Sequence, residues 1–173
     1  RIFATKDFFT LLALLGRHAV PLPLAETMAA RALLASAGIA APESPILLLA
    51  PERTANGWWQ AGVPCGELAS RALVDDGTRL RLVNLDEAPL EPLGLHGSRS
   101  ANLRWEALPE AEAVLTRPAT GLRALGAVLR ATAIAGAAER VLATDPKNGL
   151  ACRLLSAGLW HQVYRGYIPW DRE

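Results

Sequence analysis

Three histidines, His18, His96 and His161, are the side chains of this chain whose charge changes nearest to neutral pH. A catalytic histidine must lie within hydrogen-bond reach of the atom that it serves, and the sequence supplies no partner for any of the three. They stand on three different segments, so we interpret them as structural or exposed residues. The sequence identifies no catalytic residue.

The other reactive side chains predict no site either. Cys65 and Cys152 are far apart, without CxxC spacing or a nearby histidine at ligand spacing, so we expect no disulfide framework and no metal site. Cys65 also lacks a basic neighbour that would activate its thiol. Glu52 and Arg53 follow a predicted strand end, and a charged pair in that place is typical of a solvated turn.

Composition limits the class of protein. The 173 residues are 51% hydrophobic and 20% charged, which is too apolar for a disordered chain. The longest uncharged stretch, Thr54 to Gly66, contains Gly, Pro, Asn and Gln, so we expect no membrane span. Eighteen basic residues are balanced by seventeen acidic ones, and the basic residues form no cluster along the chain, so we expect no binding to nucleic acid. The chain opens on Arg1 without a signal peptide pattern, so we expect a soluble cytoplasmic protein or a fragment of one.

Two helices are predicted before residue 43. The first covers about Lys6 to Leu15, where an apolar run ends at Gly16. Pro21 and Pro23 interrupt the helical pattern. The second covers Ala25 to Ala37, with Gly38 just past its end. We expect this second helix to bury its apolar side, made of Leu24, Met28, Leu33 and Leu34.

Short strands are predicted between Pro45 and Arg117, in a small, mainly antiparallel sheet or barrel. The apolar run Ile46 to Ala50 reads as a buried strand, and Arg79 to Asn84 alternates charged with apolar residues at period two. Asp75-Asp76-Gly77 is a hairpin signal that joins the latter strand to the one before it. The remaining predicted strands are Arg71 to Val74, Leu103 to Ala107 and Glu112 to Leu115.

A long packing helix is predicted from Thr120 to Ala143. Its small and aliphatic residues fall on one side, which we call the seam and which consists of Leu122, Gly126, Leu129, Ala133, Gly136 and Ala137. We expect this side to be incompletely covered by the chain itself, and so to favour self-association or binding of a related subunit. The alternative is that the segment from Ala151 to Trp170 folds back and covers it. A last short helix, Ala151 to Leu159, and an aromatic tail follow.

The predicted fold class is therefore α+β: amino-terminal helices, a middle antiparallel β-sheet or barrel, and a long helix that begins a truncated helical domain. The corresponding ranges are 1–43, 44–118 and 119–173.

Two segments carry a resemblance to a known family. LLGRHAVPLPLAETMAARALLASAG, from Leu14 to Gly38, resembles the amino-terminal helical segment of acyl-CoA dehydrogenase-like flavoproteins, particularly the divergent bacterial members of sterol and ring degradation. GLRALGAVLRATAIAGAAERVL, from Gly121 to Leu142, is similar to the first helix of that family's carboxy-terminal domain. The resemblance covers about three quarters of the chain.

The resemblance implies FAD as cofactor and an acyl-CoA thioester as substrate, which is oxidised to its 2,3-enoyl form. At the places of the family's two flavin segments this chain reads LLLAPERTANG, from Leu47, and GVPCGE, from Gly62. The resemblance thus implies cofactor contacts at Pro51, Val63 and Pro64. The segment that carries the family's glutamate base has no counterpart in the tail after residue 143.

Two functions from different classes follow. The chain is either a dehydrogenase, incomplete as a single chain, or a non-catalytic subunit that pairs with a related flavin-bearing chain. Trp58 and Trp59 bear on the choice, because adjacent residues of a strand point to opposite faces and one ring must lie outside the core. We interpret that outer ring as a subunit or interdomain contact, with flavin stacking as the alternative.

Overall fold

The computed structural model describes residues 5–18, 22–86, 88–93, 99–150 and 152–153. His96, His161, the aromatic tail and most of the predicted helix Ala151 to Leu159 lie outside the described residues. The chain divides into two compact units, one made of Pro21–Ala124 and the other of Arg1–Val20 with Leu125–Glu173. We refer to them as the β unit and the helical unit.

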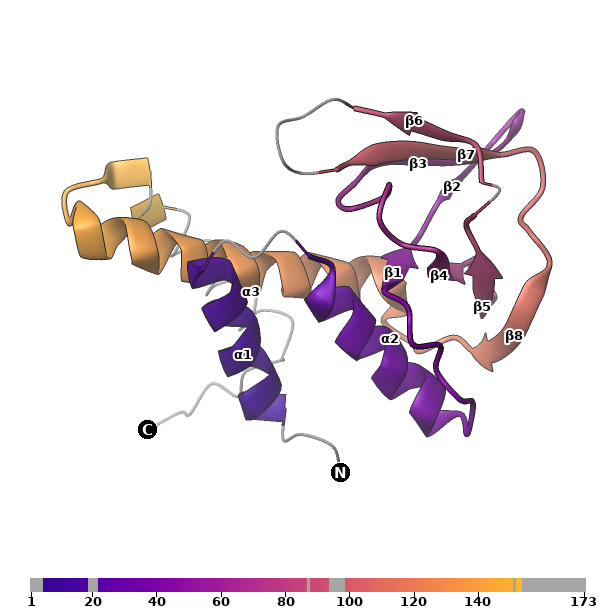
Figure 1. Cartoon of the computed structure of the whole chain (residues 1–173), viewed down its shortest axis with the longest axis horizontal. Coiled ribbons are helices and arrows are strands. Elements are labelled where there is room, and N and C mark those ends of the chain that lie inside the picture. The colour runs from indigo at the N-terminus through magenta and orange to yellow at the C-terminus, as the bar shows by residue number, and fades with distance from the viewer. Residues whose placement is uncertain (1–4, 19–21, 87, 94–98, 151, 154–173) are drawn as a thin grey trace. The chain divides into compact units, whose positions relative to one another are not determined.

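The fold is α+β, as predicted. Its helices are α1 (Thr5–Arg17), α2 (Leu24–Ser36) and α3 (Gly121–Thr144), each within two residues of its predicted bounds (Figure 1). The part of the chain that the structure describes contains eight strands, in two sheets of four. The strands are β1 (Ile46–Leu49), β2 (Glu52–Thr54), β3 (Gly57–Val63), β4 (Arg71–Asp75), β5 (Arg79–Asn84), β6 (Leu90–Pro92), β7 (Ala101–Trp105) and β8 (Ala111–Thr116).

The first sheet has the order β1-β4-β5-β8. Its β4–β5 hairpin is the predicted one, and Gly77 supplies the positive φ of +92° that the turn requires. β5 also pairs antiparallel with β8, whereas β1 pairs parallel with β4. The sheet is therefore mainly antiparallel. The parallel pairing of β1 with β4 was not predicted by any local sequence pattern.

The second sheet has the order β2-β3-β7-β6 and is antiparallel throughout. β2 contains Glu52 and Arg53, so their interpretation as a turn was wrong, although both side chains are exposed as expected. Strands β2 and β6 have three residues each, all exposed, so neither shows an apolar period in the sequence. Residues from both sheets, including Leu47, Val74, Leu103 and Trp105, form a common buried cluster.

Helix α2 packs on β1. The Thr27 hydroxyl donates a hydrogen bond to the carbonyl oxygen of Ile46 and accepts one from its N–H. Pro23, Thr27, Ala30 and Leu34 make the buried side of the helix, at spacings of three and four residues. The prediction that Leu24 is buried was wrong: this residue is 38% exposed, because Pro23 lies on the buried side in its place.

In the helical unit, α1 and α3 approach each other backbone to backbone. A Cβ atom added at Gly16 would collide with the backbone of Ala133, and one added at Gly136 would collide with the backbone of Ala13. Part of the seam is therefore covered by α1. Gly136 is buried, but Ala137, which we placed in the seam, is exposed.

Within the described residues, α3 is the one helix that is long and apolar enough to cross a membrane, by length and composition alone. In the structure, 44% of its most apolar window is buried. A core helix of a water-soluble protein meets the same two criteria.

Candidate functional site

The cofactor residues implied by the resemblance lie where β1 and β3 end. Pro51 directly follows the β1–Ala50 segment and is buried. Val63 ends β3, is 3% exposed and belongs to the buried cluster between the sheets. Pro64 follows it and is half-buried. The side chains of Pro51 and Val63 therefore pack inside the protein, and only Pro64 offers partly open surface.

A β-bulge in β3 sets the direction of these residues. Gln60 pairs with Leu103 and Val63 with Ala101, so three steps along β3 match two along β7. Gly62 adopts a φ of +57° within the bulge, and its N–H donates to Asn102 Oδ1 at 2.9 Å. The extra residue places Gln60 and Val63 on the same face. Gln60 Oε1 accepts the N–H of Ala50, beside Pro51, at 3.2 Å.

A tight turn follows β3 and contains Cys65. The N–H of Gly66 donates to the carbonyl oxygen of Val63 at 3.2 Å, and Cys65 adopts a φ of +57°, which favours glycine. Cys65 is 7% exposed, and burial, with a smaller effect of Glu26, raises the pKa of its thiol. A thiol with a raised pKa stays protonated at neutral pH, which does not suit a nucleophile.

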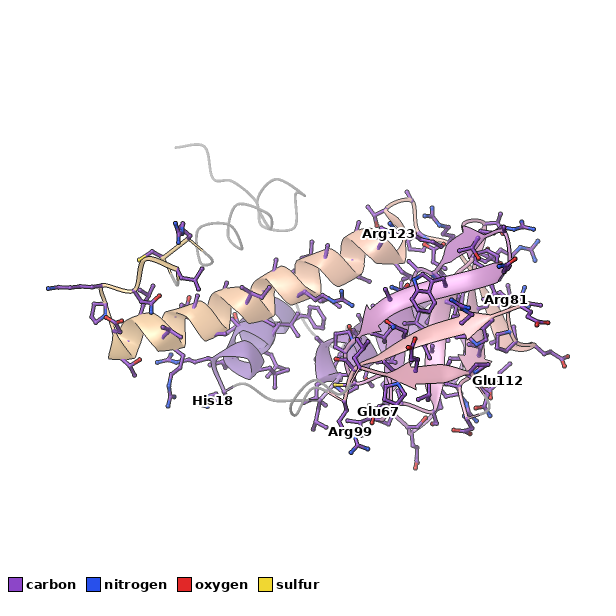
Figure 2. All side chains as sticks on the ribbon, turned by 90° about the horizontal axis from the view of Figure 1, so that it is seen from above. His18, Glu67, Arg81, Arg99, Glu112 and Arg123 are labelled. Carbon is purple, nitrogen blue, oxygen red and sulfur yellow. The ribbon has the colours of Figure 1, made fainter. Side chains whose placement is uncertain are left out.

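The Glu67–Arg99 ion pair lies beside this turn (Figure 2). Glu67 Oε2 lies 3.1 Å from Arg99 Nε, and the N–H of Glu67 donates to the carbonyl oxygen of Arg99 at 3.2 Å. The turn is therefore tied to the residues that precede β7.

The two tryptophans of β3 lie on opposite faces, as their adjacency predicts, and both are half-buried. Trp58 is paired with Trp105 and packs against the buried cluster. Trp59 is paired with Arg104, whose guanidinium carbon lies 5.1 Å from the ring centroid. The outer ring is thus partly covered by a cation–π contact within this chain.

A polar junction that the sequence did not predict joins β4 to α3. Asp75 Oδ1 accepts hydrogen bonds from Arg117 Nε at 2.7 Å and from the N–H of Gly77 at 3.0 Å. Asp75 Oδ2 accepts the N–H of Leu122 at 3.0 Å, at the start of α3. The only signal in the sequence is an acidic residue at the end of a buried strand, and it does not reveal partners more than 40 residues away.

Burial raises the pKa of Asp75, but the hydrogen bonds from Arg117, Leu122 and Gly77 outweigh it and lower the pKa below its ordinary value of 3.8. Asp75 is therefore ionised at neutral pH, and its oxygens are engaged within the protein. A carboxylate held in this way is a structural anion rather than a proton acceptor.

No group of three or more metal-ligating side chains occurs among the described residues. Of the three histidines, His18 lies among the described residues. It directly follows α1 and is exposed. The structure thus brings Pro51 close to β3 but assembles no nucleophile with a base in the part of the chain that it describes.

Comparison with known proteins finds no matching protein family, no similar curated protein and no similar solved structure.

Proposed function

We propose that this chain is a subunit of an acyl-CoA dehydrogenase-like flavoprotein of the cytoplasm. One observation carries the proposal: the two segments that resemble the family, Leu14 to Gly38 and Gly121 to Leu142, coincide with the end of α1, α2 and α3, which come before and after the strands of the two sheets in the sequence. Helices, sheets and a long helix in this order are the domain plan that the resemblance implies. The substrate class is an acyl-CoA thioester, with sterol or ring-derived acyl groups as the narrower proposal.

Removal of the substrate's α proton requires a carboxylate within hydrogen-bond distance. Asp75, the one buried carboxylate among the described residues of the β unit, is ionised but already accepts three hydrogen bonds. It therefore does not suit the base. This favours the second candidate function, in which the chain is a non-catalytic subunit and a related chain supplies flavin and base.

An exposed apolar stripe supports association with such a chain. Ile134, Ala137 and Val141 share one side of α3 at helical spacing, and Ile134 and Val141 are 45% and 40% exposed. Full burial of an exposed Val or Ile side chain is worth roughly 1.5 to 3 kcal/mol, and covering these half-exposed residues contributes a part of that. We propose that a related subunit, or a second copy, covers this α3 stripe.

FAD remains the proposed cofactor, to be held either by this chain or by its partner. In this chain Pro64, which is half-buried at the start of the turn after β3, is the residue open to it, because Pro51 and Val63 are packed inside. When bound, flavin accepts a hydride from the β carbon of the substrate. The contribution of this chain would be one wall of the flavin site, beside the turn after β3.

Two measurements on the purified chain test the proposal. Flavin absorbance and FAD titration show whether the chain binds the cofactor, and turnover of a panel of acyl-CoA thioesters with an artificial electron acceptor shows whether it reacts. We expect no turnover above a heat-killed control for the chain alone, and turnover once a related flavin-bearing chain is added. Turnover by the chain alone would exclude the non-catalytic subunit, while failure of FAD and of every acyl-CoA to bind either the chain or its complex would overturn both functions.

A further inference from the structure

The chain turns sharply where α3 ends. Pro146 follows the last residues of the helix and cannot continue it, because proline has no N–H and a fixed φ. The carbonyl oxygen of Asp145 accepts the N–H of Asn148 at 3.1 Å, which closes a turn. The carbonyl oxygen of Asn148 in turn accepts the N–H of Cys152 at 3.1 Å, in the bonding pattern of an α-helix. Residues 149, 150, 152 and 153 are helical, so a new helix begins directly after the turn.

The connection between the two helices consists of residues 145–148. Helices joined by so short a loop are antiparallel neighbours. Because both helices rise by the same amount per residue, positions that are equally far from the turn come level with each other. Val141 then lies level with about Cys152, and Ile134 lies level with about Leu159. The new helix is therefore directed back along the half of α3 that carries the α3 stripe.

The sequence after residue 153 has an apolar side. Its large apolar and aromatic residues recur at spacings of three and four, which is the helical period. They are Leu155, Leu159, Trp160, Val163, Tyr164 and Tyr167. The residues between them are polar, glycine or alanine, and Pro169 follows the pattern. This pattern predicts an amphipathic helix over residues 155–167, which we call the tail segment, with an apolar side that needs a partner.

We propose that in the free chain the tail segment packs antiparallel on the α3 stripe, with Leu159 beside Ile134. The stripe offers the apolar surface that this requires, since Ile134 and Val141 are 45% and 40% exposed. The short connection favours the tail segment over a second copy as the occupant. A segment tethered in this way has an effective concentration on the order of millimolar at the stripe, whereas a separate chain has only its own concentration in solution.

This inference goes beyond the flavoprotein proposal and needs neither flavin nor a related chain. A partner that uses the α3 stripe would first displace the tail segment. Its apparent affinity would then be reduced by the fraction of chains in which the stripe is open. Because the tests below use the chain alone and measure neither flavin nor turnover, their failure would leave the flavoprotein proposal standing.

Disulfide trapping in the full-length chain tests the register. In a Cys152→Ser background, which removes the exposed native thiol, we expect Ile134→Cys combined with Leu159→Cys to form an intramolecular disulfide on mild oxidation. Trypsin digestion of the denatured product should then release residues 131–140 linked to residues 154–165, which mass spectrometry identifies.

Glu139→Cys combined with Leu159→Cys is the matched control. Glu139 is also exposed and lies in the same tryptic fragment, but it points about 140° away from Ile134 around the helix axis. We expect this pair to remain reduced. A covalent dimer, no link between positions 134 and 159, or an equally efficient link from position 139 would each refute the proposed register.

Thiol labelling of the single Ile134→Cys variant in the same background provides the second measurement. We expect its thiol to react at least about tenfold more slowly than that of Glu139→Cys, because only the chains with an open stripe react. This protection should persist over about a hundredfold dilution, because the tail segment is tethered. Leu155→Glu combined with Leu159→Glu should abolish it and leave the rate at Glu139→Cys unchanged.

Each other result of the labelling contradicts the inference. Equal rates at the two positions in the native tail background would show that the α3 stripe is open. Protection that is lost on dilution would assign the stripe to a second copy, and protection that survives the two glutamates would exclude the apolar side of the tail segment as its cause.

Discussion

Asp75 is a buried carboxylate that connects its own turn to a region more than 40 residues away, which contains Arg117 after β8 and the first turn of α3. Such an anion at a helix start satisfies a backbone N–H that has no partner within the helix and interacts favourably with the helix dipole. Its hydrogen bonds to charged and backbone groups are the reason that its pKa lies below the ordinary value.

Asp75→Asn should therefore lower the free energy of unfolding by roughly 2 to 4 kcal/mol at neutral pH. Because the pKa of Asp75 is lower in the folded than in the unfolded state, its stabilisation is present above the unfolded pKa of about 3.9 and is lost as pH falls through the folded pKa. Urea unfolding from about pH 7 down to about pH 3 measures both effects. A constant gap between the native chain and the variant across this range would contradict the assignment.

Gly121 is required by the same junction. It adopts a φ of +65°, and an added Cβ would collide with the Arg117 guanidinium and lie 3.0 Å from Asp75 Oδ2. Gly62 has a similar φ of +57° but open space around it. The backbone cost of alanine at such a φ is about 1 to 2 kcal/mol at either position.

We expect Gly121→Ala to destabilise the protein by at least about 1 kcal/mol more than Gly62→Ala, because only the former displaces a charged side chain. Thermal or urea unfolding of the two variants gives the comparison. Equal losses would show that backbone strain alone accounts for the cost at Gly121.

At the scale of elements, the α1–α3 contact depends on two glycines that face each other's helices, Gly16 toward Ala133 and Gly136 toward Ala13. Helices can approach this closely only where one side chain is missing at each contact. Gly126, ten residues before Gly136 on α3, has nothing within 4 Å of an added Cβ. Alanine substitutions at Gly126 and Gly136 therefore distinguish the effect of helix packing from the effect of helix propensity.

Gly126→Ala should stabilise the protein by up to about 1 kcal/mol through helix propensity. Gly136→Ala gains the same propensity but should destabilise by about 1 to 3 kcal/mol, since the added methyl group forces the helices apart. Opposite shifts of the melting temperature would support the close crossing. A stabilising Gly136→Ala would exclude it.

At the scale of the whole molecule, the β unit contains the buried cluster between its sheets, the α2–β1 contact and the Asp75 junction, all within residues 21–124. It therefore has a core of its own. We expect a fragment of residues 21–124, which keeps Leu122 for Asp75, to fold cooperatively. Circular dichroism and tryptophan fluorescence during urea unfolding would measure this, and a gradual transition without a folded baseline would contradict it.

The local elements of this protein follow from the sequence by itself. The three helices appear as apolar residues at helical spacing with glycine or proline near their ends, and β4 and β5 appear as a strand pair around Asp76-Gly77. These signals involve residues that are close along the chain, so no partner from elsewhere is needed to form them. The α+β class follows from their order.

The tertiary structure alone decided the strand pairings other than β4 with β5, and which polar groups meet. β2 and β6 are too short and too exposed to show an alternation of apolar and polar residues. They form strands because β3 and β7 supply their hydrogen bonds. The parallel pairing of β1 with β4, the bulge that turns Val63 inward and the bond from Leu122 to Asp75, 47 residues apart, are likewise set by long-range contacts. A local sequence pattern cannot predict such contacts, because the energy of a contact depends on partner residues that only the folded chain brings together.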